Sequence, residues 1–248
     1  MRFDAFWIAH RGGGGAPENT LAAFRHAYAA GFRAFECDVQ VSRDGIPFLL
    51  HDATLQRTSD GRGVAARQPW SRLRRLHADR WHGRLGGVEP LPRLDAVLTF
   101  AAARRAWLNL ELKPAPGEAR RVAMAVAVAQ EVARWRRRHP DAPPPLLSSF
   151  SIAALRAARG ELARMRSPLP LALLANTFDA ALIDRALRLG AAALHLHWRA
   201  ITPARARAIH DAGLQLRAYT VNRAASAARL RALGVSGVFT DRVDLPAR

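Results

Sequence analysis

The chain has 248 residues, half of them hydrophobic and 23% charged, a composition typical of a globular protein and not of a disordered or fibrous one. Its formal net charge of +18 first raises the possibility of nucleic-acid binding. The basic residues are spread along the whole chain, however, and we interpret their tight run at residues 134–138 as a solvated helix end. We therefore expect no nucleic-acid partner, and a diffuse positive field that favours small anionic substrates.

The chain shows no pattern typical of export or membrane insertion. Its longest apolar runs, such as residues 122–129 and 169–175, fall far short of the roughly 18 residues that a membrane span requires. We expect no cleaved signal peptide, because the first residues lack a charged segment followed by an apolar one. The single cysteine, Cys37, excludes an intramolecular disulfide and suits a reducing compartment. These features predict a cytoplasmic protein with no membrane span.

Short apolar runs alternate with longer segments of helical period, which predicts βα units and a mainly parallel sheet. Eight strands are predicted, at residues 6–10, 33–39, 107–112, 146–150, 171–175, 192–197, 214–221 and 237–240. Helices are predicted between most of them, at residues 20–30, 94–105, 118–138, 152–159, 179–189, 203–212 and 224–233. Eight such units in about 250 residues are typical of an α/β fold, the TIM (β/α)8 barrel, in which catalytic groups lie at the C-terminal ends of the strands.

A ninth apolar run, at residues 46–50, breaks this alternation. Only residues 42–45 separate it from the extended second strand, too few for a parallel crossover, so the two segments should form an antiparallel hairpin. This hairpin would bring His51 level with residues 36–38. Residues 53–90 show no clear periodicity and are predicted to be a small insertion after the second strand, within one barrel domain formed by all 248 residues.

Carboxylates on two predicted strands are expected to converge. Because residues two apart share one face of a strand, Glu36 and Asp38 should point together while Cys37 points toward the helical layer. For the same reason, Glu111 shares a face with Lys113. Charges inside a barrel are costly unless they are paired or bound to a metal. The three inward carboxylates therefore predict a site for one divalent metal ion, Mg²⁺ or Ca²⁺.

Two histidines and two cations fall at the same strand ends. His10 and His51 could serve as general acid and base, because the pKa of imidazole lies near the operating pH. Arg11 and Lys113 supply permanent positive charge, and Lys113 is the one lysine among 38 basic residues, which indicates that a compact ammonium is wanted there. A metal, cations and an acid/base pair together indicate phosphoryl chemistry.

Each feature also has an ordinary structural explanation. A single His-Arg-Gly sequence is a weak signal, Glu36 and Asp38 could lie on an exposed strand edge, and Glu111 with Lys113 could form a surface ion pair. The joint placement of these residues at predicted strand ends, with apolar neighbours on the alternating face, favours a functional site.

An ordered set of motifs runs along nearly the whole chain. It comprises HRG at residues 10–12, PENT at 17–20, ECDV at 36–39, DG at 44–45, HD at 51–52 with Leu55 and RT at 57–58, LELK at 110–113, SSF at 148–150, YTVN at 219–222 and GVFTD at 237–241. Together these motifs make the chain resemble the glycerophosphodiester phosphodiesterase family, of the cytoplasmic bacterial type. An ordered set is far more specific than any one motif. The resemblance implies a TIM barrel with a small insertion after the second strand.

The resemblance also implies roles for individual residues. His10 and His51 would be the catalytic acid/base pair, Glu36, Asp38 and Glu111 would bind the metal, and Arg11 and Lys113 would hold the phosphate. A glycerol hydroxyl would attack phosphorus to give a cyclic phosphate that water then opens, with one histidine taking the hydroxyl proton and the other protonating the departing alcohol. Tyr219 stands where many relatives have tryptophan, and we expect it to pack against the glycerol.

We therefore expect a metal-dependent hydrolase of lipid and glycerol metabolism. It would convert glycerophosphodiesters, such as glycerophosphocholine or glycerophosphoethanolamine, into sn-glycerol 3-phosphate and an alcohol, acting on a small-molecule substrate as a monomer or homodimer. Two alternatives stay open. One is a lysophospholipase D-type phosphodiesterase that acts on lysophospholipids, and the other is a non-catalytic barrel that binds polyanions.

A few further residues are assigned lesser roles. His195 and His197 share a strand face and are expected at the pocket mouth. Asp241 is interpreted as a structural acid paired with Arg242 or as a pocket residue, and the structural reading is favoured. Glu18 is expected to contact a helix N-terminus or to orient Arg11. The glycine run that follows Arg11 is interpreted as a flexible loop.

Overall fold

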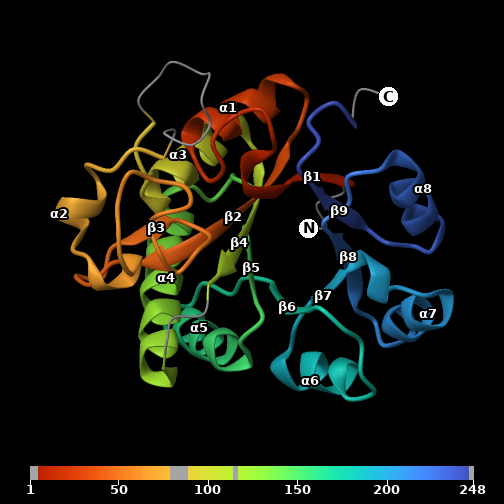
Figure 1. Cartoon of the computed structure of the whole chain (residues 1–248). Helices are drawn as coiled ribbons and strands as arrows, with labels where there is room; N and C mark the ends of the chain where they lie inside the picture. The colour runs from red at the N-terminus through yellow and green to blue at the C-terminus, as the bar shows by residue number, and fades with distance from the viewer. Residues whose placement is uncertain (1–4, 79–88, 114–116, 246–248) are drawn as a thin grey trace.

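A computed structural model describes residues 5–78, 89–113 and 117–245. Eight parallel strands close into a barrel, because the first strand pairs with both the last and the second, which confirms the predicted TIM barrel (Figure 1). The barrel strands are β1 (Trp7–Ala9), β2 (Ala34–Val41), β4 (Trp107–Leu112), β5 (Leu146–Ser149), β6 (Leu171–Ala175), β7 (Ala193–His197), β8 (Gln215–Tyr219) and β9 (Gly237–Thr240). The additional strand, β3 (Pro47–Leu49), lies outside the barrel.

Helices surround the barrel and connect successive strands (Figure 1). They are α1 (Leu21–Ala29), α2 (Trp70–Leu73), α3 (Leu94–Arg104), α4 (Glu118–Arg138), α5 (Ile152–Arg164), α6 (Leu182–Leu189), α7 (Pro203–Asp211) and α8 (Ala224–Ala232), with short 3-10 turns at His10–Gly12, Ala65–Arg67 and Trp198–Ala200. Three of them begin at a hydroxyl N-cap, since Thr20, Ser151 and Thr202 each accept a hydrogen bond from a backbone N–H three residues later. Within the described ranges, no helix combines the length and apolar composition that crossing a membrane requires.

Two helix boundaries differ by more than one residue from those predicted. Helix α5 continues through Gly160 to Arg164, because tertiary packing buries Leu162 and Glu161 accepts a hydrogen bond from Gln130 of α4. Helix α6 begins at Leu182, three residues later than predicted, because Asp179 accepts the Ala181 N–H in a turn before the helix.

The predicted hairpin is confirmed: β3 pairs antiparallel with the end of β2, with Val39 opposite Leu49. The backbone N–H of Leu50 then donates to the carbonyl of Asp38 at 3.1 Å. The next residue, His51, is therefore held at the level of the carboxylates on β2. Gly45 supplies the positive φ of the turn, at +85°.

The insertion that follows the hairpin has a small apolar core of its own. Its buried members are Phe48, Leu50, Leu55, Ala65, Leu73, Ala78 and Leu91. The short helix α2, which sequence periodicity did not indicate, packs Trp70 against Phe48. Residues 79–88 of the predicted insertion lie outside the described residues.

The main core lies between the sheet and the helices and includes Cys37, as the alternation on β2 predicted. The inside of the barrel holds a separate apolar cluster formed by Ile8, Ala34, Trp107, Leu146, Ala172, Ala193 and Phe239. Toward the carboxyl ends of the strands, polar side chains replace this apolar cluster inside the barrel. The site described below lies at those ends.

Candidate active site

Three buried carboxylates meet at the carboxyl ends of β2 and β4. The parallel register places Asp38 beside Glu111 and Glu36 beside Asn109, so these side chains share the inner face of the barrel. Glu36 is 3%, Asp38 1% and Glu111 8% exposed. One carboxylate oxygen from each of the three lies within 4.8 Å of the others, a spacing at which one ion could contact all of them.

The electrostatics of this trio favour a bound cation. Burial and the negative charge of Asp38 raise the pKa of Glu36 to about 8. Burial likewise raises the pKa of Glu111. At Asp38, burial also favours the neutral form, but the positive charges of Lys113 and Arg11 outweigh this effect and lower the pKa of the carboxyl. Two buried acceptors, Glu36 Oε1 and Asn109 Oδ1, have no hydrogen-bond donor. Carboxylate and amide oxygens in this state fit a hard divalent cation.

His10 follows β1 and is held by a residue from the far end of the chain. Its Nδ1 lies 2.7 Å from Asp241 Oδ1, and Asn222 Nδ2 donates to the other oxygen of that carboxylate at 2.8 Å. The opposite ring nitrogen, Nε2, lies 4.0 Å from Glu36 Oε2. Burial opposes protonation of His10, but the Asp241 hydrogen bond and the Glu36 charge outweigh it and raise the pKa of the imidazole.

The favoured interpretation of Asp241, a structural pair with Arg242, is therefore wrong. Arg242 instead pairs with Asp244, at 2.6 Å. The contact with His10 supports the other interpretation, a position at the pocket. This contact was not predicted, because His10 lies 231 residues away and no local pattern links the two.

His51 is held by its neighbour in the chain. Its Nδ1 lies 2.6 Å from Asp52 Oδ1, and Arg57 Nε donates to Asp52 Oδ2 at 2.5 Å. Hydrogen bonding to Arg57 lowers the pKa of Asp52 to about 2, so this carboxylate is ionised across the physiological range. At His51, burial disfavours the protonated imidazole more strongly than the nearby carboxylates favour it, so the pKa of the imidazole is lowered.

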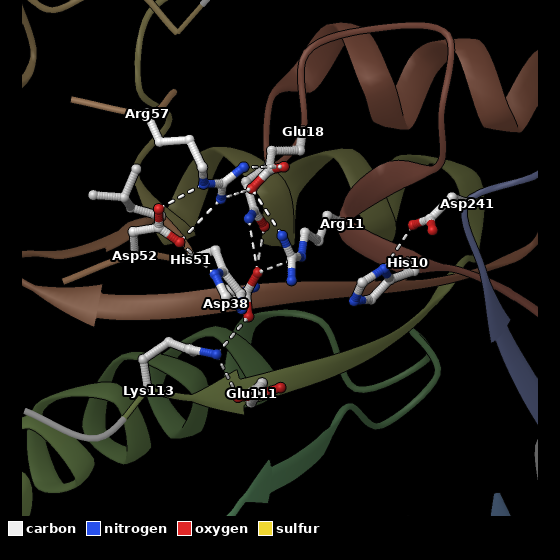
Figure 2. A network of polar contacts seen from close by, with 12 residues as sticks. His10, Arg11, Glu18, Asp38, His51, Asp52, Arg57, Glu111, Lys113 and Asp241 are labelled. Atoms are coloured by element: carbon white, nitrogen blue, oxygen red, sulfur yellow. Dashed lines mark hydrogen bonds and ion pairs between the residues drawn. The ribbon is translucent and has the colours of Figure 1, made fainter. Parts of the chain in front are cut away.

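Arg57 also reaches a second carboxylate and so joins the two halves of the site (Figure 2). Its Nη1 and Nη2 donate to Glu18 at 3.0 and 2.7 Å. Glu18 accepts in turn from Arg11 Nη1 at 3.0 Å, which confirms that Glu18 orients Arg11. The motif analysis included Arg57 without giving it a role, because nothing in the sequence pairs it with a residue 39 positions earlier.

The two predicted phosphate-binding cations contact the carboxylate trio directly. Lys113 Nζ lies 2.8 Å from Glu111 Oε1 and 3.3 Å from Asp38 Oδ1. Arg11 Nε lies 3.3 Å from Asp38 Oδ2. Asn19, which was not predicted, fixes Asp38 further by donating to its carboxylate at 2.9 Å and accepting its backbone N–H at 3.0 Å.

The loop after β1 is packed tightly, contrary to the flexible loop that its glycines predicted. Arg11 has a φ of +53°, and its backbone N–H donates to Glu36 Oε2 at 2.9 Å. Gly12 has a φ of +89°, and a Cβ at this position would lie 2.7 Å from Cβ of Ala23 in α1. The N–H of Gly14 donates to the carbonyl of Asp241 at 2.6 Å.

Many of the site residues described above surround an inner pocket of about 130 Å³. Its lining is formed by His10, Arg11, Glu36, His51, Asn109, Glu111, Lys113, Phe150, Leu174, Tyr219, Thr220 and Phe239. Tyr219 contributes its ring, which packs edge-on against Phe150, while its hydroxyl donates to Asn176 Oδ1 at 3.1 Å.

The two histidines predicted at the pocket mouth have different surroundings. His197 packs edge-on against Tyr219, next to the pocket. His195 is fully buried inside the barrel, with its ring against Phe239 and its Nε2 3.5 Å from Arg217. The expectation that His195 lies at the mouth is therefore wrong, because β7 places it one inward position below His197.

The chain matches one family model, described as the glycerophosphoryl diester phosphodiesterase family, over residues 10–245. It is 30% identical over 248 residues to a glycerophosphodiester phosphodiesterase of Bacillus altitudinis, a match that covers 96% of this chain and 94% of that protein. It is 28% identical to a glycerophosphodiester phosphodiesterase of Caldanaerobacter subterraneus subsp. tengcongensis, with 94% and 93% covered.

Solved structures show the same likeness. The structure of an Oleispira antarctica phosphodiesterase in complex with the product sn-glycerol-3-phosphate matches with a TM-score of 0.88 and 31% identity, covering 98% of this chain and 96% of that one. The crystal structure of a glycerophosphodiester phosphodiesterase from Agrobacterium tumefaciens matches with a TM-score of 0.74 and 25% identity, covering 97% of this chain and 98% of that one.

Proposed function

Because the chain belongs to the glycerophosphoryl diester phosphodiesterase family, we propose that it hydrolyses glycerophosphodiesters to sn-glycerol 3-phosphate and an alcohol through a metal-dependent site at the carboxyl ends of the barrel strands. The observation that carries this proposal is the pairing of each pocket histidine with its own aspartate beside a buried trio of carboxylates. The product bound in the Oleispira antarctica phosphodiesterase is the one we propose for this chain.

Glu36, Asp38 and Glu111 would hold the metal, and the donorless oxygen of Glu36 supports this assignment. A divalent cation bound there would neutralise negative charge on the phosphate oxygens and so favour attack on phosphorus. Mg²⁺ and Ca²⁺ both suit an all-oxygen ligand set. Arg11 and Lys113 would add two fixed positive charges beside the same phosphate.

The two histidines would divide the proton transfers. In each, the aspartate fixes Nδ1, which leaves Nε2 free to exchange a proton in the pocket. One histidine would take the proton of the glycerol hydroxyl as its oxygen bonds to phosphorus, and the other would protonate the departing alcohol. Water would then open the cyclic phosphate to give sn-glycerol 3-phosphate. Tyr219 and Phe150 would pack against the glycerol half in the inner pocket.

An enzyme-coupled assay of glycerol 3-phosphate release tests this function. We expect purified protein to release glycerol 3-phosphate from glycerophosphoethanol, to lose this activity in EDTA, and to regain it when Mg²⁺ or Ca²⁺ is added in excess. Activity that EDTA leaves intact would remove the metal from the proposal. Salt-sensitive DNA binding without any hydrolysis would favour the polyanion-binding alternative.

A further inference from the structure

A second, larger cavity adjoins the inner pocket. It is an open groove of about 810 Å³, within the size range of small-molecule sites. The groove lies between α4, which Figure 1 shows alongside β2 and β3, and the first part of the insertion. Among the described residues, His51 and Lys113 line both the groove and the inner pocket. The two cavities therefore meet where the phosphate would bind.

Seven of the sixteen described lining residues of the groove are apolar. The hairpin and the insertion contribute Val41, Ala53, Val64 and Ala66, and α4 contributes Ala123, Met124 and Ala127. No aromatic ring is among the described lining residues. Burial of apolar surface here would stabilise a bound aliphatic chain by roughly 25 cal/mol per Å² removed from water.

The charges on the groove are mostly positive. Arg43 and Arg120 join Lys113 in the lining, and Arg120 is anchored by a hydrogen bond to the carbonyl of Ala66. Among the described lining residues the one acidic side chain is that of Asp52, which is already bonded to His51 and Arg57. Recognition of a quaternary ammonium requires aromatic faces or an available carboxylate. The described lining offers neither.

The sizes of the two cavities indicate which half of a glycerophosphodiester each of them would bind. The glycerol half is small and common to all such substrates, which suits the inner pocket of about 130 Å³. The half that leaves as an alcohol would then extend from the phosphate past His51 into the groove. Building on the function proposed above, we infer that the groove binds the leaving alcohol and that this alcohol carries an uncharged aliphatic chain, in preference to choline or ethanolamine.

The positions of the two histidines relative to the cavities also indicate which proton transfer each would perform. Since His51 borders the groove and His10 lines only the inner pocket, His10 takes the proton of the attacking glycerol hydroxyl. As the new bond forms between that oxygen and phosphorus, the bond from phosphorus to the alcohol oxygen breaks. His51, whose protonated form the contact with Asp52 stabilises against burial, gives its proton to the departing oxygen.

Three glycerophosphodiesters, of ethanol, octanol and choline, test the groove with the metal-loaded protein. We expect kcat/KM for the octanol diester to exceed that for the choline diester by at least about tenfold. Replacing the exposed groove residue Ala123 by tryptophan (Ala123→Trp) should lower the octanol-to-ethanol ratio of kcat/KM by at least about tenfold, because the indole occupies the groove. The matched control Ala228→Trp, at an exposed position on α8 outside the groove, should keep that ratio. Arg43→Glu should improve the choline diester relative to the octanol diester.

The outcomes separate this inference from the function on which it rests. If the choline diester matches the octanol diester and Ala123→Trp leaves the octanol-to-ethanol ratio unchanged, the groove does not select the alcohol, while the proposed hydrolysis stands. If none of the three diesters is cleaved under any metal condition, both the proposed function and the inference are overturned.

Discussion

Asp241 Oδ1 lies 2.7 Å from Nδ1 of His10, so the end of the last barrel strand orients a side chain that follows the first. His51 and Asp52 repeat the arrangement at 2.6 Å on the other side of the pocket. In both pairs the carboxylate fixes the ring and stabilises its protonated form, and under the proposed function Nε2 would be left for the substrate. Closure of the barrel through β1 and β9 would then be part of the catalytic geometry.

Asp241→Asn should impair catalysis without unfolding the protein. The amide keeps the size of the side chain but no longer stabilises a protonated His10, so kcat should fall by up to about 10⁴-fold. Because Asp241 raises the pKa of His10, its neutral replacement should move the limb of kcat/KM that reports His10 to lower pH. A pH profile with an unchanged limb and a normal kcat would show that Asp241 does not position His10; circular dichroism confirms the fold.

Arg57→Lys should reduce activity although it preserves the charge. Arg57 uses three nitrogens to bind Asp52 and Glu18 at once, a geometry that a single ammonium cannot reproduce. We expect kcat to fall and KM to rise by a combined factor of about 10 to 100, because the residue positions both His51 and Arg11.

Arg62→Lys, at an exposed position in the same insertion, is the matched control and should behave as wild type. Steady-state kinetics on both variants distinguishes a positioning role from a general effect of removing an arginine. Equal kinetics for the two variants would exclude Arg57 as the link between the halves of the site.

Metal binding should release a proton at pH 7. Burial and Asp38 raise the pKa of Glu36 to about 8, so this group is mostly protonated in the metal-free protein at pH 7. A metal ligand must be ionised, so the apparent affinity should increase as the pH rises from 6 toward 8. Calorimetric titration in two buffers of different ionisation enthalpy measures the released proton; identical heats in the two buffers would contradict it.

Glu111→Gln should weaken the same binding while leaving the fold intact. The amide offers a neutral oxygen where the carboxylate offers a charged one, so the titration midpoint should move to higher metal concentration by about 10- to 100-fold. A midpoint equal to that of wild type would remove Glu111 from the ligand set.

Local sequence patterns predicted the barrel well because each βα unit carries its own periodicity. The strands at residues 107–112, 171–175 and 237–240 and the helix at residues 118–138 have the predicted bounds. The helix predicted at residues 152–159 was too short, because packing against α4 carries α5 past Gly160 to Arg164. The short helix α2 was missed because four residues are too few to show a period.

The convergence of the carboxylates was predictable because it follows from the alternation of side chains along a strand. Alternation places Glu36, Asp38 and Glu111 on the inner face, and the β2–β4 register confirms their convergence. It says nothing of contacts between distant loops, which is why the roles of Arg57 and Asp241 emerged only from the structure. The groove beside α4 could not be predicted from the sequence either, because its apolar lining residues come from segments more than fifty residues apart that show no shared motif.

A phosphorus NMR time course of glycerophosphodiester hydrolysis by the metal-loaded protein tests the two histidines most directly. Wild type should convert the diester resonance into that of sn-glycerol 3-phosphate, whereas His10→Ala and His51→Ala should each lower turnover by about 10² to 10⁴. Both variants should bind the metal with a near-normal midpoint, because neither histidine belongs to the carboxylate trio. Near-normal turnover in either variant would contradict the division of proton transfer between His10 and His51.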